Sequence, residues 1–197
     1  GIYNKNDIQG FAVDEVTGIV SRRADALVKA DTLIETIETD ANGIGLFVSD
    51  LPCGIYYLKE IKAPTGYHTS DEVYEFDASY TGENGNAVIS LSYDFYNKPT
   101  VVKITKYDLT NGKELSGAEL KVTDEEGNEI DSWTSTEEGH YIRHLELDKK
   151  YTLTEVLARD GYTSTESIDF IITDKDGNGN ITTVQEVKMY AVSVEGE

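Results

Sequence analysis

The sequence is poor in the residues that build disulfides and metal sites. Its 197 residues include one cysteine, Cys53, and three histidines. A single cysteine cannot form an internal disulfide, and no Cys/His cluster has the spacing of a zinc site. His68, His140 and His144 fit neither a metal-binding nor a catalytic-triad spacing, so we expect them at surface or strand positions. The sequence therefore indicates no metal centre and no cofactor.

Basic residues are also scarce, since 17 Lys and Arg face 37 Asp and Glu, for a net charge of −20. The acidity is spread evenly, −9 over residues 1–98 and −11 over residues 99–197, which is typical of a solvated surface. Such a field repels phosphate backbones, which argues against nucleic-acid binding. No apolar run approaches the roughly 20 residues of a membrane span, and the opening residues do not resemble a signal peptide. We expect neither nucleic acid nor membrane insertion.

Strand-forming segments are abundant. The 13 tyrosines and 39 % hydrophobic residues exclude a disordered chain. Short runs rich in Val, Ile, Thr and Tyr alternate with polar residues between turns of Gly, Asn and Asp, which indicates an all-β protein of sandwich type. The one helix-like stretch, residues 22–38, alternates like a strand from residue 32 onward. We predict strands over residues 33–39, 45–51, 56–61, 73–80, 88–96, 101–107, 118–123, 140–147, 151–156, 168–173 and 181–192.

One long motif occurs twice. The pattern Y-x-L-x-E-x-x-A-x-x-G-Y begins at Tyr56 and again, 95 residues later, at Tyr151. A single repeat of this length indicates a domain duplication rather than a solenoid. The boundary is expected near Pro99, which can end a strand without needing a ladder donor. We predict two β-sandwich domains, residues 1–98 and 99–197, joined by a short and rather stiff connection.

Alternation along the strands predicts buried ionisable side chains. Successive side chains of a strand point to opposite faces, so an inward Val102 and Ile104 place Lys106 inward as well. The same alternation buries Glu155 in the second repeat and its equivalent Glu60 in the first. A buried lysine and a buried glutamate are each costly unless they are paired.

Two readings of these buried groups are open. Burial lowers the pKa of a lysine and raises that of a glutamate, which favours both neutral forms. A neutral amine is a nucleophile, and a neutral carboxylic acid can polarise an amide carbonyl and move protons. Beside an inward carboxamide, such as that of Asn97, these groups suit amine attack with loss of ammonia, which gives a Lys–Asn isopeptide bond. The alternative is a plain salt bridge at the ends of two strands.

The repeat resembles the Cna protein B-type, prealbumin-like domains that build stalks of Gram-positive surface adhesins and pilins. The resemblance covers nearly the whole chain and rests on the repeated motif, on Leu51-Pro52-x-Gly54 before the first copy, and on Lys106-x-Asp108 followed by Gly117-Ala118. It implies two tandem immunoglobulin-like or prealbumin-like sandwiches. In that family a first-strand lysine, a glutamate of the motif strand and an Asn or Asp near the last strand form a self-catalysed isopeptide bond.

The resemblance assigns roles residue by residue. In the second domain Lys106 matches the donor and Glu155 the catalytic acid, while Ala191 stands at the acceptor position. Alanine has no side-chain carbonyl, so we expect this domain not to close the bond. In the first domain Glu60 matches the acid and Asn97 the acceptor, but no segment before Gly1 resembles the donor strand, so we expect this domain to lack its N-terminal strand. We therefore expect an exposed sheet edge there, open to strand addition from another chain.

One further motif resembles the opening of an EF-hand calcium loop, with Asp174, Asp176 and Asn178 at alternate positions. Gln185 stands where the bidentate glutamate belongs, and strands rather than helices are predicted on both sides. The alternatives are a hairpin turn and a weak calcium site.

Together these features predict a structural stalk fragment of a Gram-positive adhesin or pilin, extracellular and attached to the cell wall in the full-length protein. Its expected partners are neighbouring domains of the same surface protein, with host extracellular matrix contacted through other domains. The cross-linking chemistry is internal and occurs once, so we do not expect an enzyme. The alternatives are a ligand-binding module for host protein or glycan, and an accessory domain of a secreted hydrolase.

Overall fold

The computed structural model describes residues 1–79 and 91–194, and the secondary structure of these residues is strand and turn without any helix. The predicted all-β class is therefore confirmed. No helix in these described ranges is long and apolar enough to span a bilayer. The strands are β1 (Ile2–Asn4), β2 (Ile8–Val13), β3 (Val20–Val28), β4 (Leu33–Glu35), β5 (Ile55–Lys59), β6 (Val73–Asp77), β7 (Val101–Asp108), β8 (Glu119–Thr123), β9 (Glu129–Thr134), β10 (His140–Arg143), β11 (Lys150–Leu157), β12 (Ile168–Ile171) and β13 (Gln185–Ala191).

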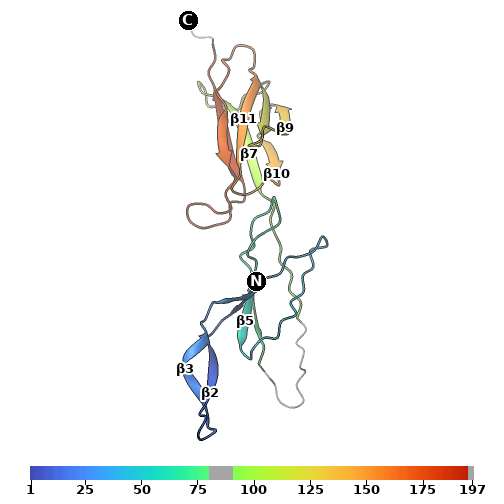
Figure 1. The fold of residues 1–197 in the computed structure, drawn as a ribbon. Helices are drawn as coiled ribbons and strands as arrows, with labels where there is room; N and C mark the ends of the chain where they lie inside the picture. Colours follow the sequence, from blue (N-terminus) through green and yellow to red (C-terminus); the bar gives the residue numbers. More distant parts are fainter. Residues whose placement is uncertain (80–90, 195–197) are drawn as a thin grey trace. The chain divides into compact units, whose positions relative to one another are not determined.

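The chain forms two compact units, which Figure 1 shows as a ribbon. Unit 1 contains residues 1–62 and 70–96, and unit 2 contains residues 63–69 and 97–197. Segment 63–69, which closes the motif of the first repeat, thus packs with unit 2. The division into domains 1–98 and 99–197 stays a prediction.

Unit 2 is a sandwich of two sheets. One has the strand order β10-β7-β13 and the other β12-β11-β8-β9. Their inner faces share one core, to which the first sheet contributes Ile104 and Met189 and the second contributes Leu120 and Leu153. In the first sheet β13 runs parallel to β7, whereas β10 runs antiparallel to it. The central strand β7 is therefore held on both edges.

Unit 1 contains a sheet of order β4-β1-β5-β6 and a separate two-stranded sheet, β2-β3. Its β5 carries the first copy of the motif, and Tyr56 in that strand is fully buried. The Tyr56 hydroxyl donates a hydrogen bond of 2.6 Å to the Pro52 carbonyl. The segment that looked helix-like in the sequence, residues 22–38, contains most of β3 and all of β4.

Among the described residues of unit 1, two segments predicted as strands do not form them. Residues 45–51 and 91–96 form no strand, although their composition favours one, and residues 80–90 lie outside the described part of the chain. Their counterparts by chain order in unit 2 are β10 and β13, and both of these pair with β7. A segment with high strand propensity becomes a strand only when a neighbouring strand pairs with it. The described residues of unit 1 contain no equivalent of β7 that could pair with these two segments.

Candidate functional site

The candidate site of unit 2 is a buried ion pair between its two sheets. Lys106 lies on β7 and Glu155 on β11, and 2.8 Å separates Lys106 Nζ from Glu155 Oε1. Both side chains are almost completely buried, with 0 % and 1 % of their surface exposed. The structure thus brings together the two residues that the sequence singled out as donor and acid. Their chemical roles stay predictions.

A third residue, Thr165, completes the cluster. Its backbone N–H donates a hydrogen bond of 2.6 Å to Glu155 Oε2, and its hydroxyl lies 2.6 Å from Lys106 Nζ, which donates to it. The hydroxyl in turn donates to the Tyr190 carbonyl on β13, at 3.0 Å. Thr165 therefore connects the pair on β7 and β11 to the last strand. No sequence motif marks this position, so the role of Thr165 was not predicted.

Burial determines the electrostatics of the lysine. Desolvation lowers the pKa of Lys106 from its ordinary value, while the neighbouring Glu155 carboxylate opposes that shift. A lowered pKa increases the fraction of the lysine that is neutral at a given pH, and only the neutral amine can attack a carbonyl carbon. The same amine lies between the Glu155 carboxylate, which can take up a proton, and the Thr165 hydroxyl, which accepts a hydrogen bond from it.

The predicted acceptor strand lies directly beside the lysine. In the parallel ladder of β13 and β7, Met189 pairs with Lys106 and Ala191 pairs with Asp108. Met189 and Ala191 both face the core, with 0 % and 1 % of their surface exposed. Neither side chain carries a carbonyl. The site thus has an amine and an acid, whereas the adjacent inward positions of β13 offer nothing for the amine to attack.

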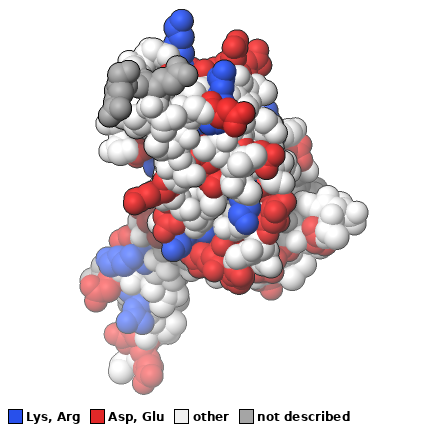
Figure 2. Space-filling view, turned by 90° about the horizontal axis from the view of Figure 1, so that it is seen from above, with Lys and Arg blue, Asp and Glu red and all other residues white. Residues whose placement is uncertain are grey.

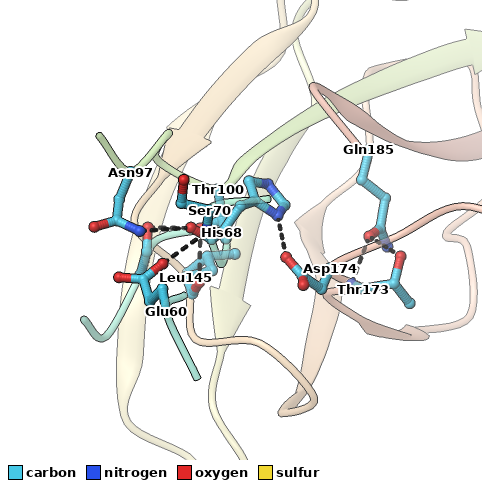
Figure 3. A network of polar contacts seen from close by, with 10 residues as sticks. Glu60, His68, Ser70, Asn97, Thr100, Leu145, Thr173, Asp174 and Gln185 are labelled. Carbon is cyan, nitrogen blue, oxygen red and sulfur yellow. Dashed lines mark hydrogen bonds and ion pairs between the residues drawn. The ribbon is translucent and has the colours of Figure 1, made fainter. Parts of the chain in front are cut away.

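The first repeat reproduces one part of this cluster. Glu60 Oε2 accepts a hydrogen bond of 2.6 Å from the Ser70 N–H, as Glu155 Oε2 does from Thr165 ten residues further along. Figure 3 shows the Glu60–Ser70 contact. Asn97, the predicted acceptor, belongs to unit 2, where its Nδ2 donates to the His68 carbonyl at 3.0 Å. The acid and acceptor roles of Glu60 and Asn97 stay predictions.

His68 was predicted to lie at the surface or in a strand, and this was wrong. Only 2 % of the residue is exposed, and its Nδ1 lies 2.9 Å from Asp174 Oδ1 (Figure 3). Its backbone N–H donates to the Lys98 carbonyl. These contacts hold segment 63–69 in unit 2. A lone histidine without a motif gives no sequence signal for such a pair, because Asp174 is 106 residues away.

The calcium-like motif forms a tight turn. Asp176 Oδ1 accepts hydrogen bonds from the backbone N–H groups of Asn178 and Asn180, at 2.8 and 2.9 Å. These bonds lower the pKa of the Asp176 carboxyl group. Asp174 is engaged with His68 instead. This geometry is that of a hairpin turn, the first of the two alternatives. Among the described residues, no group of three or more His, Cys, Asp and Glu side chains could hold a metal ion.

Both halves of the chain match a known family of domains. Two stretches, residues 3–93 and 100–187, match the model of the SpaA prealbumin-like fold domain. No curated protein sequence matches the chain. Among solved structures, the Bacillus anthracis TIE protein is 24 % identical with a TM-score of 0.46, over 96 % of this chain and 32 % of its own. This chain therefore spans about a third of that protein's length.

Two Lactobacillus rhamnosus GG pilus proteins are also similar. The C-terminal fragment of the pilus adhesin SpaC is 20 % identical with a TM-score of 0.42, over 75 % of this chain and 79 % of its own. The shaft pilin SpaA is 14 % identical with a TM-score of 0.40, over 81 % of this chain and 68 % of its own. The two family matches cover nearly the whole chain and confirm the predicted tandem prealbumin-like architecture. The chain belongs to the SpaA prealbumin-like fold domain family.

Proposed function

We propose that this chain is a structural stalk segment of a Gram-positive surface adhesin or pilin, extracellular and attached to the cell wall in the full-length protein. Its partners are then the neighbouring domains of the same protein. The single observation that carries the proposal is the buried Lys106–Glu155 pair, which joins the two sheets of unit 2 where the first strand runs beside the last. Membership of the SpaA prealbumin-like family supports it.

We further propose that unit 2 retains the machinery of a self-catalysed isopeptide bond. With an asparagine at the acceptor position, the neutral Lys106 amine would attack the carboxamide carbon. Glu155 would protonate the carbonyl oxygen and then carry the amine proton to the leaving nitrogen. One C–N bond forms, one C–N bond breaks, and one ammonia leaves. The reaction happens once per molecule, so the chain is not an enzyme.

A bond between β7 and β13 suits a stalk for mechanical reasons. It would join the first and last strands of the unit covalently, so a pulling force on the chain ends could not separate the parallel pair. A disulfide performs this task in many secreted domains, and the only cysteine here is the exposed Cys53. Because Ala191 has no side-chain carbonyl, the bond cannot form at this position, and β7 and β13 are then held by noncovalent contacts alone.

Intact mass under denaturing conditions tests the chemistry. The chain should have its plain sequence mass, whereas the Ala191→Asn variant should lose the mass of one ammonia as it folds. Ala191→Asn combined with Glu155→Gln is the matched control, and it should keep its full mass because the acid is gone. Circular dichroism would confirm that each variant is folded.

The neighbouring position tests the register. Met189→Asn places the same carboxamide two residues away, beside Lys106 in the ladder. Ammonia loss in this variant alone would move the acceptor position from residue 191 to residue 189. If both folded variants keep their full mass, the isopeptide proposal is wrong and the pair is a salt bridge only.

A further inference from the structure

Segment 63–69 is fixed in unit 2 by two backbone hydrogen bonds to the residues that lead into β7. The Thr100 N–H donates to the Gly66 carbonyl at 2.9 Å, and the His68 N–H donates to the Lys98 carbonyl at 2.8 Å. These residues are covered, since Gly66 is buried and only 1 % of Thr100 and 2 % of His68 are exposed. The first repeat therefore shows this arrangement with its surroundings complete.

The second repeat builds the same arrangement just after β13, with segment 158–164 in the place of segment 63–69. The Val194 N–H donates to the Gly161 carbonyl at 2.8 Å, and the Thr163 N–H donates to the Val192 carbonyl at 3.0 Å. Here, however, Gly161 and Thr163 are exposed, and so is 61 % of Val194. The backbone arrangement is repeated, but its cover is not.

The cover of the first arrangement is the loop that follows β10. A Cβ at Gly66 would lie 2.6 Å from the His144 carbonyl oxygen, so the backbone of this loop packs directly on the glycine. The ring of Tyr67 lies against the ring of His144, with centroids 4.9 Å apart. The Thr100 hydroxyl donates to the Leu145 carbonyl at 2.6 Å (Figure 3). The loop thus binds both strands of the arrangement.

The corresponding place in the second repeat is open, since no atom beyond the chain neighbours of Gly161 lies within 4 Å of a Cβ built there. We propose that segment 158–164 and residues 192–194 form a docking surface for a further domain of the same prealbumin-like kind. The loop of that domain equivalent to residues 144–145 packs on Gly161, and its first strand begins after residue 194. This inference rests on the proposed stalk, whose partners are neighbouring domains, and assigns the surface that binds one of them.

The two surfaces have the same backbone shape, so the same kind of loop fits both. Gly66 has φ +80° and Gly161 has φ +84°, and the carbonyl of each accepts a hydrogen bond from the adjoining segment. Exposed Val192 and Val194 add apolar surface that a docked domain would bury. Because a loop of a prealbumin-like sandwich covers the first surface, its copy is complementary to the same kind of domain.

Amide hydrogen exchange on the chain as it stands tests whether the second surface is incomplete. The Thr163 and Val194 amides should have protection factors about tenfold lower than those of the His68 and Thr100 amides, because only the latter pair is covered. Equal protection of the two pairs overturns the proposal, since the second surface would then need no partner.

A second copy of the sandwich of unit 2 supplies the partner. In this extended chain, residues 194–197 are replaced by a second copy of residues 100–197. The protection factor of the Thr163 amide should rise about tenfold, towards that of His68. The matched control has a flexible Gly-Ser spacer in front of the second copy, which keeps the added domain but breaks its register. The Thr163 amide should stay as weakly protected there as in the parent chain.

The remaining outcomes also decide the proposal. Protection of Thr163 in both extended chains, or in neither, overturns it. Gly161→Ala in the extended chain should return Thr163 to the protection that the same variant shows in the parent chain, because its Cβ would occupy the place of the docked loop. Circular dichroism checks that the added copy is folded, and the exchange measurement on the parent chain does not depend on it. Intact mass reports on the chemistry of Lys106 independently, which keeps this test separate from that of the proposed function.

Discussion

At the scale of single residues, the informative feature is a lysine in a place where charges are costly. An ion pair in a low-dielectric interior recovers its desolvation cost only when geometry and further hydrogen bonds are good. Lys106 has both, since a carboxylate and a threonine hydroxyl lie within 2.8 Å of its Nζ. A pair of apolar side chains would fill the same space at no electrostatic cost. The proposed isopeptide chemistry would require such a pair, and apolar side chains could not supply it.

The pH dependence of stability should reveal this burial. Because the pKa of Lys106 is lowered in the folded unit, the unfolded chain binds more protons between that lowered value and the ordinary 10.5. The free energy of unfolding contributed by Lys106 therefore rises with pH through this window. We expect the difference in unfolding free energy between the parent chain and Lys106→Met to shift in favour of the parent from neutral pH towards pH 10.5.

Urea unfolding at several pH values measures this difference. Tyrosine ionisation occurs in both proteins over the same range and cancels in the comparison. A difference that stays flat or falls with pH would contradict a lowered pKa for Lys106. Lys149 offers a second comparison, because its side chain is half exposed and its ion pair with Glu146 lies at the surface.

At the scale of elements, segment 63–69 is notable because it closes the motif of the first repeat but packs in unit 2. Gly66 lies in this segment with φ +80°, and a Cβ placed there would come 2.6 Å from the His144 carbonyl oxygen. Its repeat equivalent Gly161 has φ +84° but open space around the same position. Both glycines adopt the left-handed conformation, but only at Gly66 would a side chain also collide with the backbone of His144.

Alanine at these two positions separates the two effects. Both variants should lose about 1–3 kcal/mol through backbone strain, and Gly66→Ala should lose more because a rigid backbone stands in the way of its Cβ. The change in the unfolded chain is the same for both and cancels. Thermal unfolding of the two variants side by side measures the difference. Equal losses would mean that segment 63–69 does not pack against His144 in solution.

Features that depend on neighbouring residues could be predicted from the sequence. The alternation along each strand predicted the burial of Lys106 and Glu155, because strand parity is a local property. The repeated motif was enough to predict the family. The contact of His68 with Asp174 depends on residues 106 positions apart, which no local pattern encodes. Residues 45–51 failed as a strand for a related reason, since pairing depends on a partner strand and not on composition.

At the scale of the whole molecule, the dominant property is a net charge of −20. Figure 2 shows acidic side chains spread over the visible face, with basic ones between them. Like charges at this density repel one another and destabilise the compact state. The ion pairs that oppose this repulsion, such as Lys150–Asp169, are largely exposed and contribute little. Self-repulsion should therefore outweigh local attraction on the surface.

Salt should accordingly stabilise this protein. Mobile ions screen charges more than about 10 Å apart at 0.1 M ionic strength, which weakens the distributed repulsion and leaves the buried Lys106–Glu155 pair almost untouched. The melting temperature should rise as sodium chloride is increased from a few millimolar to physiological strength. Potassium chloride should act equally, since screening does not depend on the identity of the cation. A melting temperature that falls with salt would mean that local ion pairs, and not the net charge, govern the surface of this chain.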